Sequence, residues 1–241
     1  MSPDGKRVLI TGAARRVGRA LAVAVAAAGA DVVIHYDQSQ PEAESARDEV
    51  IALGRQAFIL QANLGDPQQA ADLVPRALEY GPLFALVNNA SIFEPLTWDN
   101  TNLEAWERHL GVNLTAPFLL SQAFARCLPE QASGRIVNLL DWRAQRPGAD
   151  HLPYTVSKAA LAALTQSLAV ALAPRVTVNG LALGAILPPS DGAAVPSILA
   201  TVPAQRWADL DEVAQALLFL LAGPAYLTGD ILYIDGGRHL V

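Results

Sequence analysis

The segment Thr11-Gly12-Ala13-Ala14-Arg15-Arg16-Val17-Gly18 determines the architecture that we expect for this chain. It follows an apolar run at residues 8–11, which is typical of a buried strand, and it leads into an alanine-rich run at 16–29, which favours a helix. Such a strand-to-helix junction points backbone N–H groups and the positive end of the helix at a phosphate. Gly12 permits a tight turn and Gly18 permits close packing of the helix on the sheet. Because this turn after the first strand belongs to open doubly wound sheets, it argues against a closed barrel.

Short apolar runs and longer helical segments alternate along the rest of the chain. Further strands are expected at 31–36, 57–60, 82–88, 135–140, 175–179 and 230–234, and helices at 41–53, from 67 onward, and at 102–112, 115–128, 154–172 and 210–221. Nearly unbroken apolar strands between helices are typical of a parallel sheet that is covered on both faces. We therefore expect one α/β domain over residues 1–241, a Rossmann-like doubly wound parallel sheet of about seven strands with helices on both faces.

The composition excludes several classes of protein. The chain has 241 residues, is 52% hydrophobic and 17% charged, and carries a net charge of −6, whereas a surface that binds nucleic acid needs a basic patch. Cys127 is the one cysteine, so neither a disulfide framework nor a cysteine-based metal site is expected, and His109, His151 and His239 lack the spacing of metal ligands. The longest apolar run, 20–28, is about half a membrane span and the N-terminus has no signal-sequence pattern, so we expect a cytoplasmic protein without a membrane segment.

Tyr154 and Lys158 form the strongest chemical motif. Four residues apart on a helix, they share one face, with about 5–6 Å between their β-carbons. A phenol with a pKa of about 10 is a weak acid at neutral pH, and a neighbouring ammonium group stabilises the phenolate. We therefore expect Lys158, together with the positive charge of an oxidised cofactor, to lower the pKa of Tyr154, which would donate a proton while the cofactor delivers hydride to a C=O or C=N bond.

These motifs, in this order, resemble those of the short-chain dehydrogenases/reductases. The glycine turn is similar to T-G-x-x-x-G-x-G, Asn88-Asn89-Ala90-Ser91 to the turn after strand four, Val178–Gly184 to V-N-x-x-x-P-G, and Asp235-Gly236-Gly237 to the C-terminal D-G-G. The resemblance implies an NAD(P)-dependent oxidoreductase that forms a homotetramer or homodimer and acts on a small molecule. It assigns catalysis to Asn113, Tyr154 and Lys158, with Asn113 holding a proton-relay water.

Three departures from the general pattern resemble the pteridine reductases and dihydromonapterin reductases. Arg16 replaces the middle glycine of the turn, Phe93 ends a segment similar to N-A-S-x-F, and Asp141 stands where most members have a serine that polarises a carbonyl. An ionised carboxylate repels a developing oxyanion and suits a substrate that presents N–H donors. The resemblance implies that Arg16, Phe93, Asp141 and Tyr154 bind a pterin or dihydrofolate ring, and we expect Trp142 to line the same pocket.

The residues around the second strand bear on the choice of cofactor. Arg15 and the segment His35-Tyr36-Asp37-Gln38-Ser39 resemble the cradle for the 2′-phosphate of NADP, although Gln38 replaces an arginine and Asp37 adds a negative charge. We expect NADP(H), with NAD(H) as the alternative. The resemblance implies that the remaining cofactor contacts come from a further set of residues. This set comprises Gly12, Arg16, Val17, Gly18, Asn63, Leu64, Asn89, Ala90, Ser91, Tyr154, Lys158 and Gly184.

The sequence leaves two other functions open. A carbonyl reductase, for example of 3-oxoacyl thioesters, is common in this superfamily, but Asp141 argues against it. A catalytically weak cofactor-binding protein is the other alternative, and the complete set of Asn113, Tyr154 and Lys158 argues against that. Residues 188–203 are rich in Pro, Gly, Ser and Ala, and the segment 187–207 around them is expected to form a substrate lid.

Overall fold

A single parallel sheet forms the centre of the protein. The computed structural model describes residues 3–187 and 196–241. Its seven strands are ordered β3-β2-β1-β4-β5-β6-β7, and all neighbouring pairs are parallel. The strands are β1 (Arg7–Ile10), β2 (Asp31–Tyr36), β3 (Ala57–Gln61), β4 (Ala85–Asn88), β5 (Gly134–Asp141), β6 (Val176–Leu183) and β7 (Ile231–Ile234). The expected Rossmann-like sheet is therefore confirmed.

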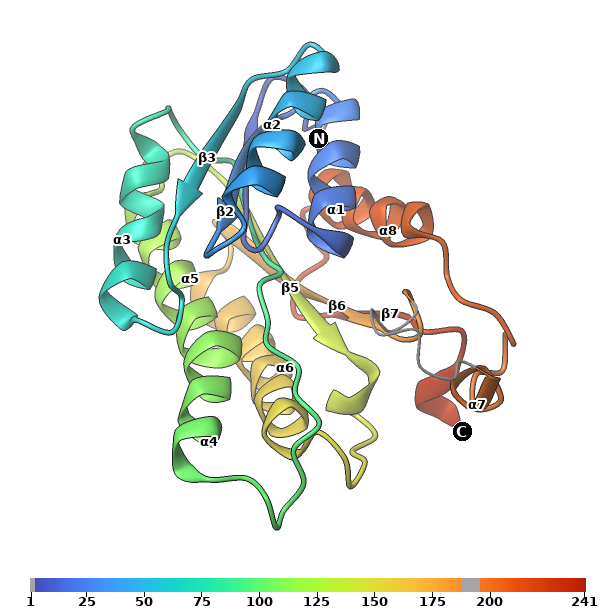
Figure 1. Cartoon of the computed structure of the whole chain (residues 1–241). Helices are drawn as coiled ribbons and strands as arrows, with labels where there is room; N and C mark the ends of the chain where they lie inside the picture. Colours follow the sequence, from blue (N-terminus) through green and yellow to red (C-terminus); the bar gives the residue numbers. More distant parts are fainter. Residues whose placement is uncertain (1–2, 188–195) are drawn as a thin grey trace.

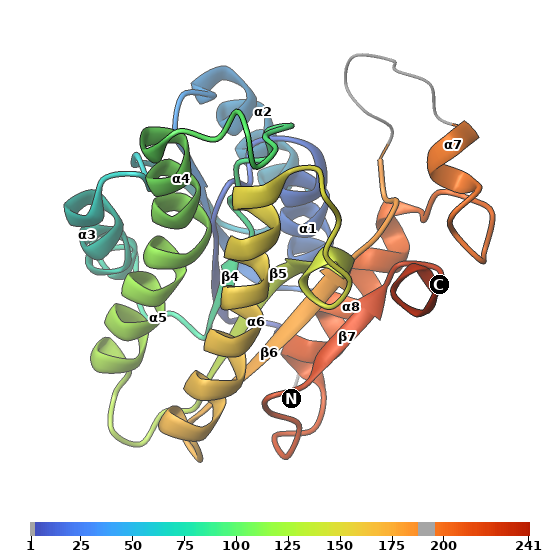
Figure 2. The same ribbon diagram turned by 90° about the horizontal axis from the view of Figure 1, so that it is seen from below.

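Helices cover both faces of the sheet, as Figures 1 and 2 show. On one face lie α1 (Arg16–Ala27), α2 (Gln40–Ala52) and α8 (Leu210–Ala222), and on the other α3 (Pro67–Leu78), α5 (Ala116–Cys127) and α6 (Leu152–Leu172). A turn of π-helix, η1 (Gly111–Thr115), joins α4 (Leu103–Leu110) directly to α5. The short elements are η2 (Trp142–Ala144), α7 (Pro196–Leu199) and η3 (Arg238–Leu240).

Local sequence signals explain where several helices begin and end. The Asp66 side chain accepts hydrogen bonds from the backbone N–H groups of Gln68 and Gln69, which caps α3 as the Asp-Pro pair predicts. Asp209 and Glu212 form a capping box at the start of α8. Gly29, just beyond α1, adopts a φ of +96°, the conformation that ends a helix most readily at glycine.

The order of the strands fixes the position of a ligand crevice. The chain runs outward from β1 through β2 to β3, then returns to pair β4 with the other side of β1. Ligands of open α/β sheets bind outside the carboxyl ends of the strands at such a reversal. Thr11 and Asn89 follow these two strands directly, so the topology predicts a ligand site beside the glycine turn.

The structure differs from the sequence-based expectation at three elements. The strand β6 extends to Leu183, four residues beyond the expected end, because it pairs along its whole length with β5. The two expected helices at 102–112 and 115–128 form one continuous rod through the π-helical turn. Within the expected lid, residues 196–199 are helical, while 188–195 lie outside the described residues.

The helix α6 is long and apolar enough in composition to cross a membrane. It also carries the buried polar side chains of Ser157, Lys158 and Thr165 and packs against β5 and β6. Buried polar groups with partners in the same fold are typical of the core of a globular domain. We therefore describe α6 as the core helix that presents the Tyr154–Lys158 pair to the sheet.

Candidate active site

The glycine turn packs against the end of β4 with no room for side chains. Gly12 has a φ of +61°, and a β-carbon on it would lie 3.0 Å from the Cα of Ala90. A β-carbon on Gly18 would lie 2.2 Å from the Gly12 carbonyl oxygen and 2.6 Å from Nδ2 of Asn89. Glycine is therefore required at both positions, and the close approach leaves a backbone-lined cradle at the start of α1 that suits a diphosphate.

Arg16 occupies the place of the missing middle glycine in that turn. Its φ is +50°, which is the left-handed region that glycine adopts without cost. For any other residue this conformation costs about 1–2 kcal/mol. The exposed Arg16 side chain therefore stands on a strained backbone beside the cradle.

Thr11 and Asn89 hold the turn onto β4. The Thr11 hydroxyl accepts hydrogen bonds from the backbone N–H groups of Asn89 and Ala90, both at 2.9 Å. The Asn89 amide donates to the carbonyl oxygens of Thr11 at 2.8 Å and Gly12 at 3.1 Å. The sequence prediction that Asn89 and Ala90 belong to the cofactor site is consistent with this geometry, because both residues line the turn.

His35 supports the turn from below, so our expectation that it contacts a cofactor phosphate was wrong. Its ring is 2% exposed, Nδ1 accepts a hydrogen bond from the backbone N–H of Gly12 at 3.0 Å, and Nε2 lies 3.0 Å from the carbonyl oxygen of Ala62. Because Nδ1 accepts, the ring is neutral and Nε2 donates. Burial lowers the pKa of His35 to about 4, so both nitrogens are committed to the backbone at neutral pH. Tyr36 is also buried, and packs in the core.

Arg15 and Ser39 lie where the 2′-phosphate of NADP is expected. The Arg15 guanidinium forms an ion pair at 3.1 Å with Glu42 of α2, and both side chains are about half exposed. Ser39 directly precedes α2 and its side chain makes no capping hydrogen bond. Arg15 directly precedes α1 and Ser39 directly precedes α2, and a guanidinium and a hydroxyl at two helix N-termini can bind a phosphate group.

Asn63 and Leu64 form part of the loop after β3. The Asn63 side-chain oxygen accepts a hydrogen bond from the backbone N–H of Gly65 at 2.9 Å, and its own backbone N–H donates to Gln69 at 2.8 Å. The Leu64 side chain is 6% exposed and packs in the core. The loop therefore fixes the Asn63 side chain. Because the Leu64 side chain is buried, only the backbone of Leu64 could make the cofactor contact that the resemblance implies.

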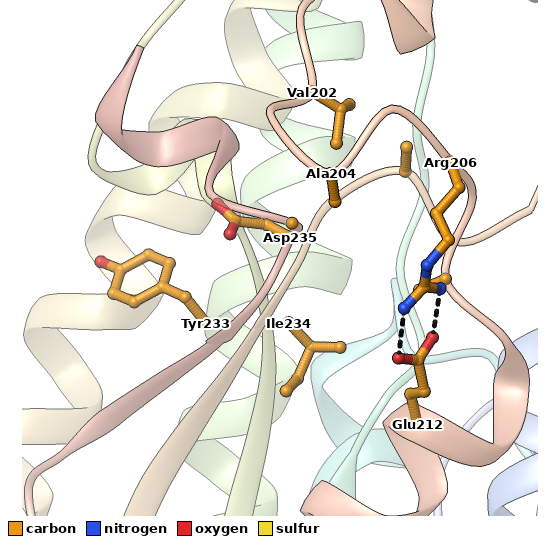
Figure 3. A pocket seen from close by; sticks show the side chains of 10 residues that line it. Val202, Ala204, Arg206, Glu212, Tyr233, Ile234 and Asp235 are labelled. Carbon is orange, nitrogen blue, oxygen red and sulfur yellow. Dashed lines mark hydrogen bonds and ion pairs between the residues drawn. The ribbon is translucent and has the colours of Figure 1, made fainter.

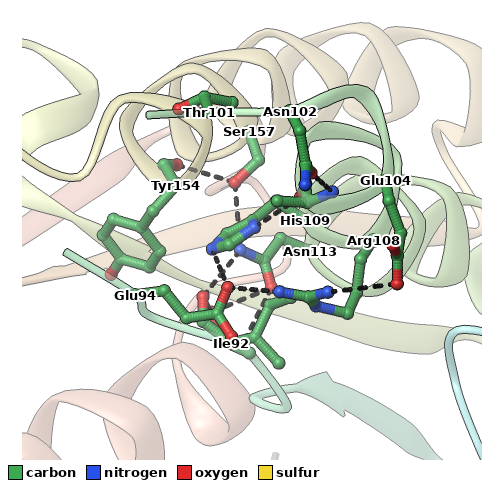
Figure 4. Close-up of polar contacts among 12 residues, drawn as sticks. Ile92, Glu94, Thr101, Asn102, Glu104, Arg108, His109, Asn113, Tyr154 and Ser157 are labelled. Atoms are coloured by element: carbon green, nitrogen blue, oxygen red, sulfur yellow. Dashed lines mark hydrogen bonds and ion pairs between the residues drawn. The ribbon is translucent and has the colours of Figure 1, made fainter. Parts of the chain in front are cut away.

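Asn113 joins three elements of the site through the π-helical turn (Figure 4). Its side-chain oxygen accepts hydrogen bonds from the Ser91 hydroxyl at 3.1 Å and the backbone N–H of Ile92 at 2.9 Å. Its amide donates to the Ile92 carbonyl oxygen and to the Ser157 hydroxyl, both at 3.0 Å. Ser157 in turn donates to the carbonyl oxygen of Tyr154 at 2.7 Å. Asn113 therefore ties the loop after β4 to helix α6, which carries Tyr154 and Lys158.

Figure 4 also shows how Glu94 is held on this loop. Its carboxylate accepts a hydrogen bond from the Arg108 guanidinium at 2.6 Å and lies 3.8 Å from Nε2 of His109, which is buried without a hydrogen-bond partner. Nδ1 of His109 is 2.8 Å from the carbonyl oxygen of Ala105. These contacts fix the segment that carries Phe93 to α4.

Tyr154, Asp141 and Lys158 meet at the carboxyl end of β5. The Tyr154 hydroxyl donates to Oδ2 of Asp141 at 3.0 Å, and Oδ1 of Asp141 accepts from the backbone N–H of Arg143 at 2.9 Å. Lys158 donates to the carbonyl oxygen of Leu139 at 2.7 Å, and its Nζ lies 5.7 Å from the centre of the Tyr154 ring. The three predicted catalytic residues on β5 and α6 thus converge, with the carboxylate nearest to the phenol.

The electrostatics of this group correct our expectation for the tyrosine. Burial and the neighbouring Asp141 carboxylate raise the pKa of Tyr154 well above its usual range, so Lys158 by itself does not lower this pKa as we expected. Burial also raises the pKa of Asp141, and it lowers the pKa of Lys158 to about 8. The protein's own groups therefore keep Tyr154 protonated at neutral pH, which is the form that donates a proton in a reduction.

Phe93 offers an aromatic surface next to Tyr154. The ring is 54% exposed and meets the Tyr154 ring edge-on, with 4.6 Å between centroids and an interplanar angle of 82°. His151 stacks on it at 3.9 Å and 10°. Exposed aromatic rings are suited to stacking with a planar heterocycle.

The remaining predicted contacts lie at the ends of β5, β6 and β7. Trp142 follows Asp141 directly in η2. A β-carbon on Gly184 would lie 2.5 Å from the Cα of Asp235, so glycine is required for β6 and β7 to end side by side. A pocket of about 210 Å³ opens beside Asp235 under the segment 202–208, bordered by the Arg206–Glu212 ion pair (Figure 3). Tyr154 does not line that pocket, which therefore lies beside the catalytic group rather than over it.

Comparison with known proteins identifies the family. The model of the short chain dehydrogenases matches residues 6–196. The chain belongs to the short-chain dehydrogenase family. Among the curated relatives of this short-chain dehydrogenase, the 3-oxoacyl-[acyl-carrier-protein] reductase of Synechocystis sp. is 35% identical over 95% of both chains.

Two solved structures resemble this short-chain dehydrogenase over nearly their whole length. The FolM alternative dihydrofolate reductase 1 of Brucella canis, complexed with NADP, superposes with a TM-score of 0.92 at 34% identity and covers 100% of this chain and 97% of its own. A short chain dehydrogenase of Burkholderia cenocepacia, also in complex with NADP, gives a TM-score of 0.93 at 39% identity and covers 99% of both chains.

Sequence reasoning missed several residues that organise the site of this short-chain dehydrogenase. Ser157, fully buried between Asn113 and the Tyr154 carbonyl, was not singled out. Asn138 donates to Thr165 at 2.9 Å and accepts from Asn88 at 2.8 Å in the core behind the site. A signal for Asn138 was present, because a lone amide within an apolar strand needs a buried partner.

Proposed function

We propose that this short-chain dehydrogenase reduces the ring of a pterin or dihydropterin, including dihydrofolate, with NADPH. The observation that carries the proposal is the hydrogen bond from the Tyr154 hydroxyl to the Asp141 carboxylate, at the place where carbonyl reductases of the family have a serine. Serine would polarise a carbonyl oxygen, whereas a carboxylate accepts hydrogen bonds. The site is therefore suited to a substrate that presents N–H groups to Asp141.

The glycine turn fits a dinucleotide. Because Gly12 and Gly18 have no side chains, the turn packs closely on the end of β4 and places the N-terminus of α1 where a helix can bind a diphosphate. Arg15 with Ser39 supplies donors for a 2′-phosphate. The relatives from Brucella canis and Burkholderia cenocepacia, both complexed with NADP, support the choice of NADP(H) over NAD(H). When bound, the cofactor supplies a hydride to the substrate carbon.

The proton comes from the protein. Tyr154 is held protonated by burial and by Asp141, and Asp141 itself takes up a proton more readily than an ordinary carboxyl group because its burial raises its pKa. The pair can therefore deliver one proton to a ring nitrogen as the adjacent carbon receives hydride, which balances the reduction of a C=N bond. Lys158, close to Tyr154, adds a positive charge that stabilises the phenolate left behind.

Phe93 supports an aromatic substrate. Its exposed ring lies against Tyr154, so a planar heterocycle stacked on it stays beside the proton donor. Such stacking contributes about 0.5–1.5 kcal/mol beyond the burial of apolar area. A flexible acyl chain gains less from this arrangement.

The test is to measure NADPH and NADH oxidation with dihydrobiopterin, dihydrofolate and a short 3-oxoacyl thioester in parallel. We expect turnover of the pterins with NADPH, loss of that turnover by at least about 100-fold in Tyr154→Phe, and a comparable loss in Asp141→Ser. Binding of NADPH, followed by its fluorescence, should survive in Tyr154→Phe. Full turnover by Tyr154→Phe would contradict the assignment of the proton donor.

Carbonyl reduction is the second candidate, because a 3-oxoacyl-[acyl-carrier-protein] reductase is among the relatives of this chain. In that case the thioester would be the better substrate of the wild-type protein. Asp141→Ser would then raise thioester turnover, since it replaces a carboxylate by the hydroxyl that polarises a carbonyl. The same variant thus separates the two functions by the direction of its effect.

Assembly into a homo-oligomer is part of the proposal. Phe118 on α5 and Val156 on α6 are 39% and 36% exposed, which leaves apolar surface on two of the helices that follow β4 and β5. Pairing of these helices between subunits would cover that surface. Light scattering during size-exclusion chromatography measures the molar mass of the protein in solution. A monomer at micromolar concentration would contradict the expected homo-oligomer.

A further inference from the structure

Two arginines lie against Trp142, the residue that follows Asp141. The guanidinium carbon of Arg238, in the C-terminal turn η3, is 4.2 Å from the centre of the Trp142 ring, and that of Arg143 is 5.1 Å away. A guanidinium that lies over an aromatic ring still presents N–H groups at its edge. The sequence alone gives no sign of this arrangement, because residues 142 and 238 are far apart in the chain.

The two arginines differ in how their charge is balanced. Arg143 forms a two-pronged ion pair with Asp150, with distances of 2.7 Å and 2.9 Å. Within residues 3–187 and 196–241, no carboxylate lies within 4.0 Å of the Arg238 guanidinium, and its Nε is buried without a hydrogen-bond partner. Burial and the neighbouring Arg143 lower the pKa of Arg238. Asp141, Asp150 and Asp235 act on this pKa in the opposite direction, from beyond ion-pair distance. The site thus holds a partly desolvated cation that has no direct carboxylate partner among the described residues.

Asp235 fixes the position of that cation. This buried carboxylate accepts hydrogen bonds from the backbone N–H groups of Gly237 at 2.9 Å and His239 at 2.8 Å, and it lies 2.8 Å from Nδ1 of His239. The His239 ring also stacks on Tyr233 at 4.0 Å. The residues on both sides of Arg238 are therefore anchored, which limits the conformations open to its side chain.

We propose that Arg238 binds an anionic group, a carboxylate or a phosphate, on the side chain of the substrate. The inference rests on the proposed function, since it places the reacting ring at Phe93 and Asp141 and the side chain along Trp142 toward η3. Carboxylates and phosphates accept two N–H donors of one guanidinium, and these charge-assisted bonds are about twice as strong as neutral ones. The enzyme therefore favours pterins with an anionic side chain over those with a neutral one.

Three substrates with the same type of ring test this inference. Dihydrobiopterin has a neutral side chain, dihydrofolate has carboxylates and dihydroneopterin monophosphate has a phosphate. We expect Arg238→Ala to lower kcat/KM by about 10- to 100-fold for the anionic substrate that Arg238 binds, and to change it by less than about twofold for dihydrobiopterin. The substrate whose kcat/KM falls more, dihydrofolate or dihydroneopterin monophosphate, shows whether the anion is a carboxylate or a phosphate.

Matched variants separate recognition from structure. Arg126→Ala removes an exposed arginine from α5 and changes the net charge equally, and it should leave all three rates unchanged. Arg238→Lys, which retains a point charge but not the forked donor, should restore part of the lost kcat/KM. The dissociation constant of dihydrofolate, measured by calorimetry with wild type and Arg238→Ala, should rise by the same factor as kcat/KM falls.

The outcomes distinguish the two proposals. Equal losses with all three substrates, or no loss with any, would overturn the role of Arg238 while leaving pterin reduction intact. If the wild-type protein reduces none of the three pterins, the proposed function itself fails, and the preference for an anionic pterin fails with it.

Discussion

Replacing His35 by Asn should remove a pH-dependent component of the stability of this protein. His35 is neutral in the fold because its Nδ1 accepts a hydrogen bond from Gly12 and its Nε2 donates to Ala62. Asn is not titratable and its side-chain oxygen can still accept from Gly12. The variant therefore retains support for the glycine turn but loses the donor to Ala62 and some packing.

The size of the effect follows from the two pKa values. The pKa of His35 is about 4 in the folded protein against 6.5 in the unfolded chain, so the unfolded chain binds more protons between these values. Stability from this group is therefore present above the unfolded pKa and is lost as the pH falls toward the folded pKa. The linkage relation gives a loss of about 2 kcal/mol between pH 7 and pH 5, and a limit of about 3.4 kcal/mol at lower pH.

Urea unfolding at pH 7.0, 6.0 and 5.0, followed by tryptophan fluorescence, measures the change. The wild-type free energy of unfolding should fall by about 2 kcal/mol more than that of His35→Asn over this range. The fixed cost of lost packing in the variant does not affect the comparison, because only the two slopes are compared. Parallel slopes for the two proteins would refute the conclusion that His35 is buried in its neutral form.

Three further predictions concern the glycine turn and Lys158. Arg16→Gly should be more stable than Arg16→Ala by about 1 kcal/mol in urea unfolding, because only glycine adopts the left-handed backbone at φ +50° without strain. In an ordinary helix alanine is the more stabilising of the two residues, so a higher free energy of unfolding for Arg16→Ala would contradict this prediction. Gly18→Ala should abolish measurable NADPH binding in a fluorescence titration, since its methyl group would lie 2.2 Å from the Gly12 carbonyl oxygen. The control Gly54→Ala, at φ +77° with open space around it, should bind NADPH normally and lose only about 1–2 kcal/mol of stability. The kcat/KM for reduction should fall above about pH 8 as the Lys158 ammonium loses its proton, and a flat profile from pH 7 to 9.5 would argue that its charge is not required.

The fold could be predicted from the sequence because its signals are local. Each strand is a short apolar run, each helix has the matching periodicity, and the glycine turn fixes the type of sheet. His35 shows the limit of this reasoning. It was placed correctly at the end of β2, but β2 is buried on both faces of a parallel sheet, so a polar residue there must find partners inside the protein.

The proximity of the candidate catalytic residues was predictable in part, but their electrostatics were not. Tyr154 and Lys158 are neighbours on one helix, so their pairing follows from helical spacing. The dominant partner of Tyr154 is Asp141, which comes from the end of β5 and meets it only in the folded chain. Contacts such as those of Ser157 with Asn113, or of Arg238 with Trp142, likewise depend on distances between elements that no local pattern contains.

The π-helical turn at Gly111–Thr115 limits how this enzyme can change in evolution. Such a turn holds one residue more than an α-helical turn, and here that turn carries Asn113 between α4 and α5. Deleting a single residue from it would restore a regular helix and rotate α4 by about 100° relative to α5. The Glu94–Arg108 contact and the Asn113 network could then not form together. Variants with a single-residue deletion in a surface loop should therefore remain active, whereas variants with a deletion in this turn should not. A library of single-residue deletions that is selected for activity would test this.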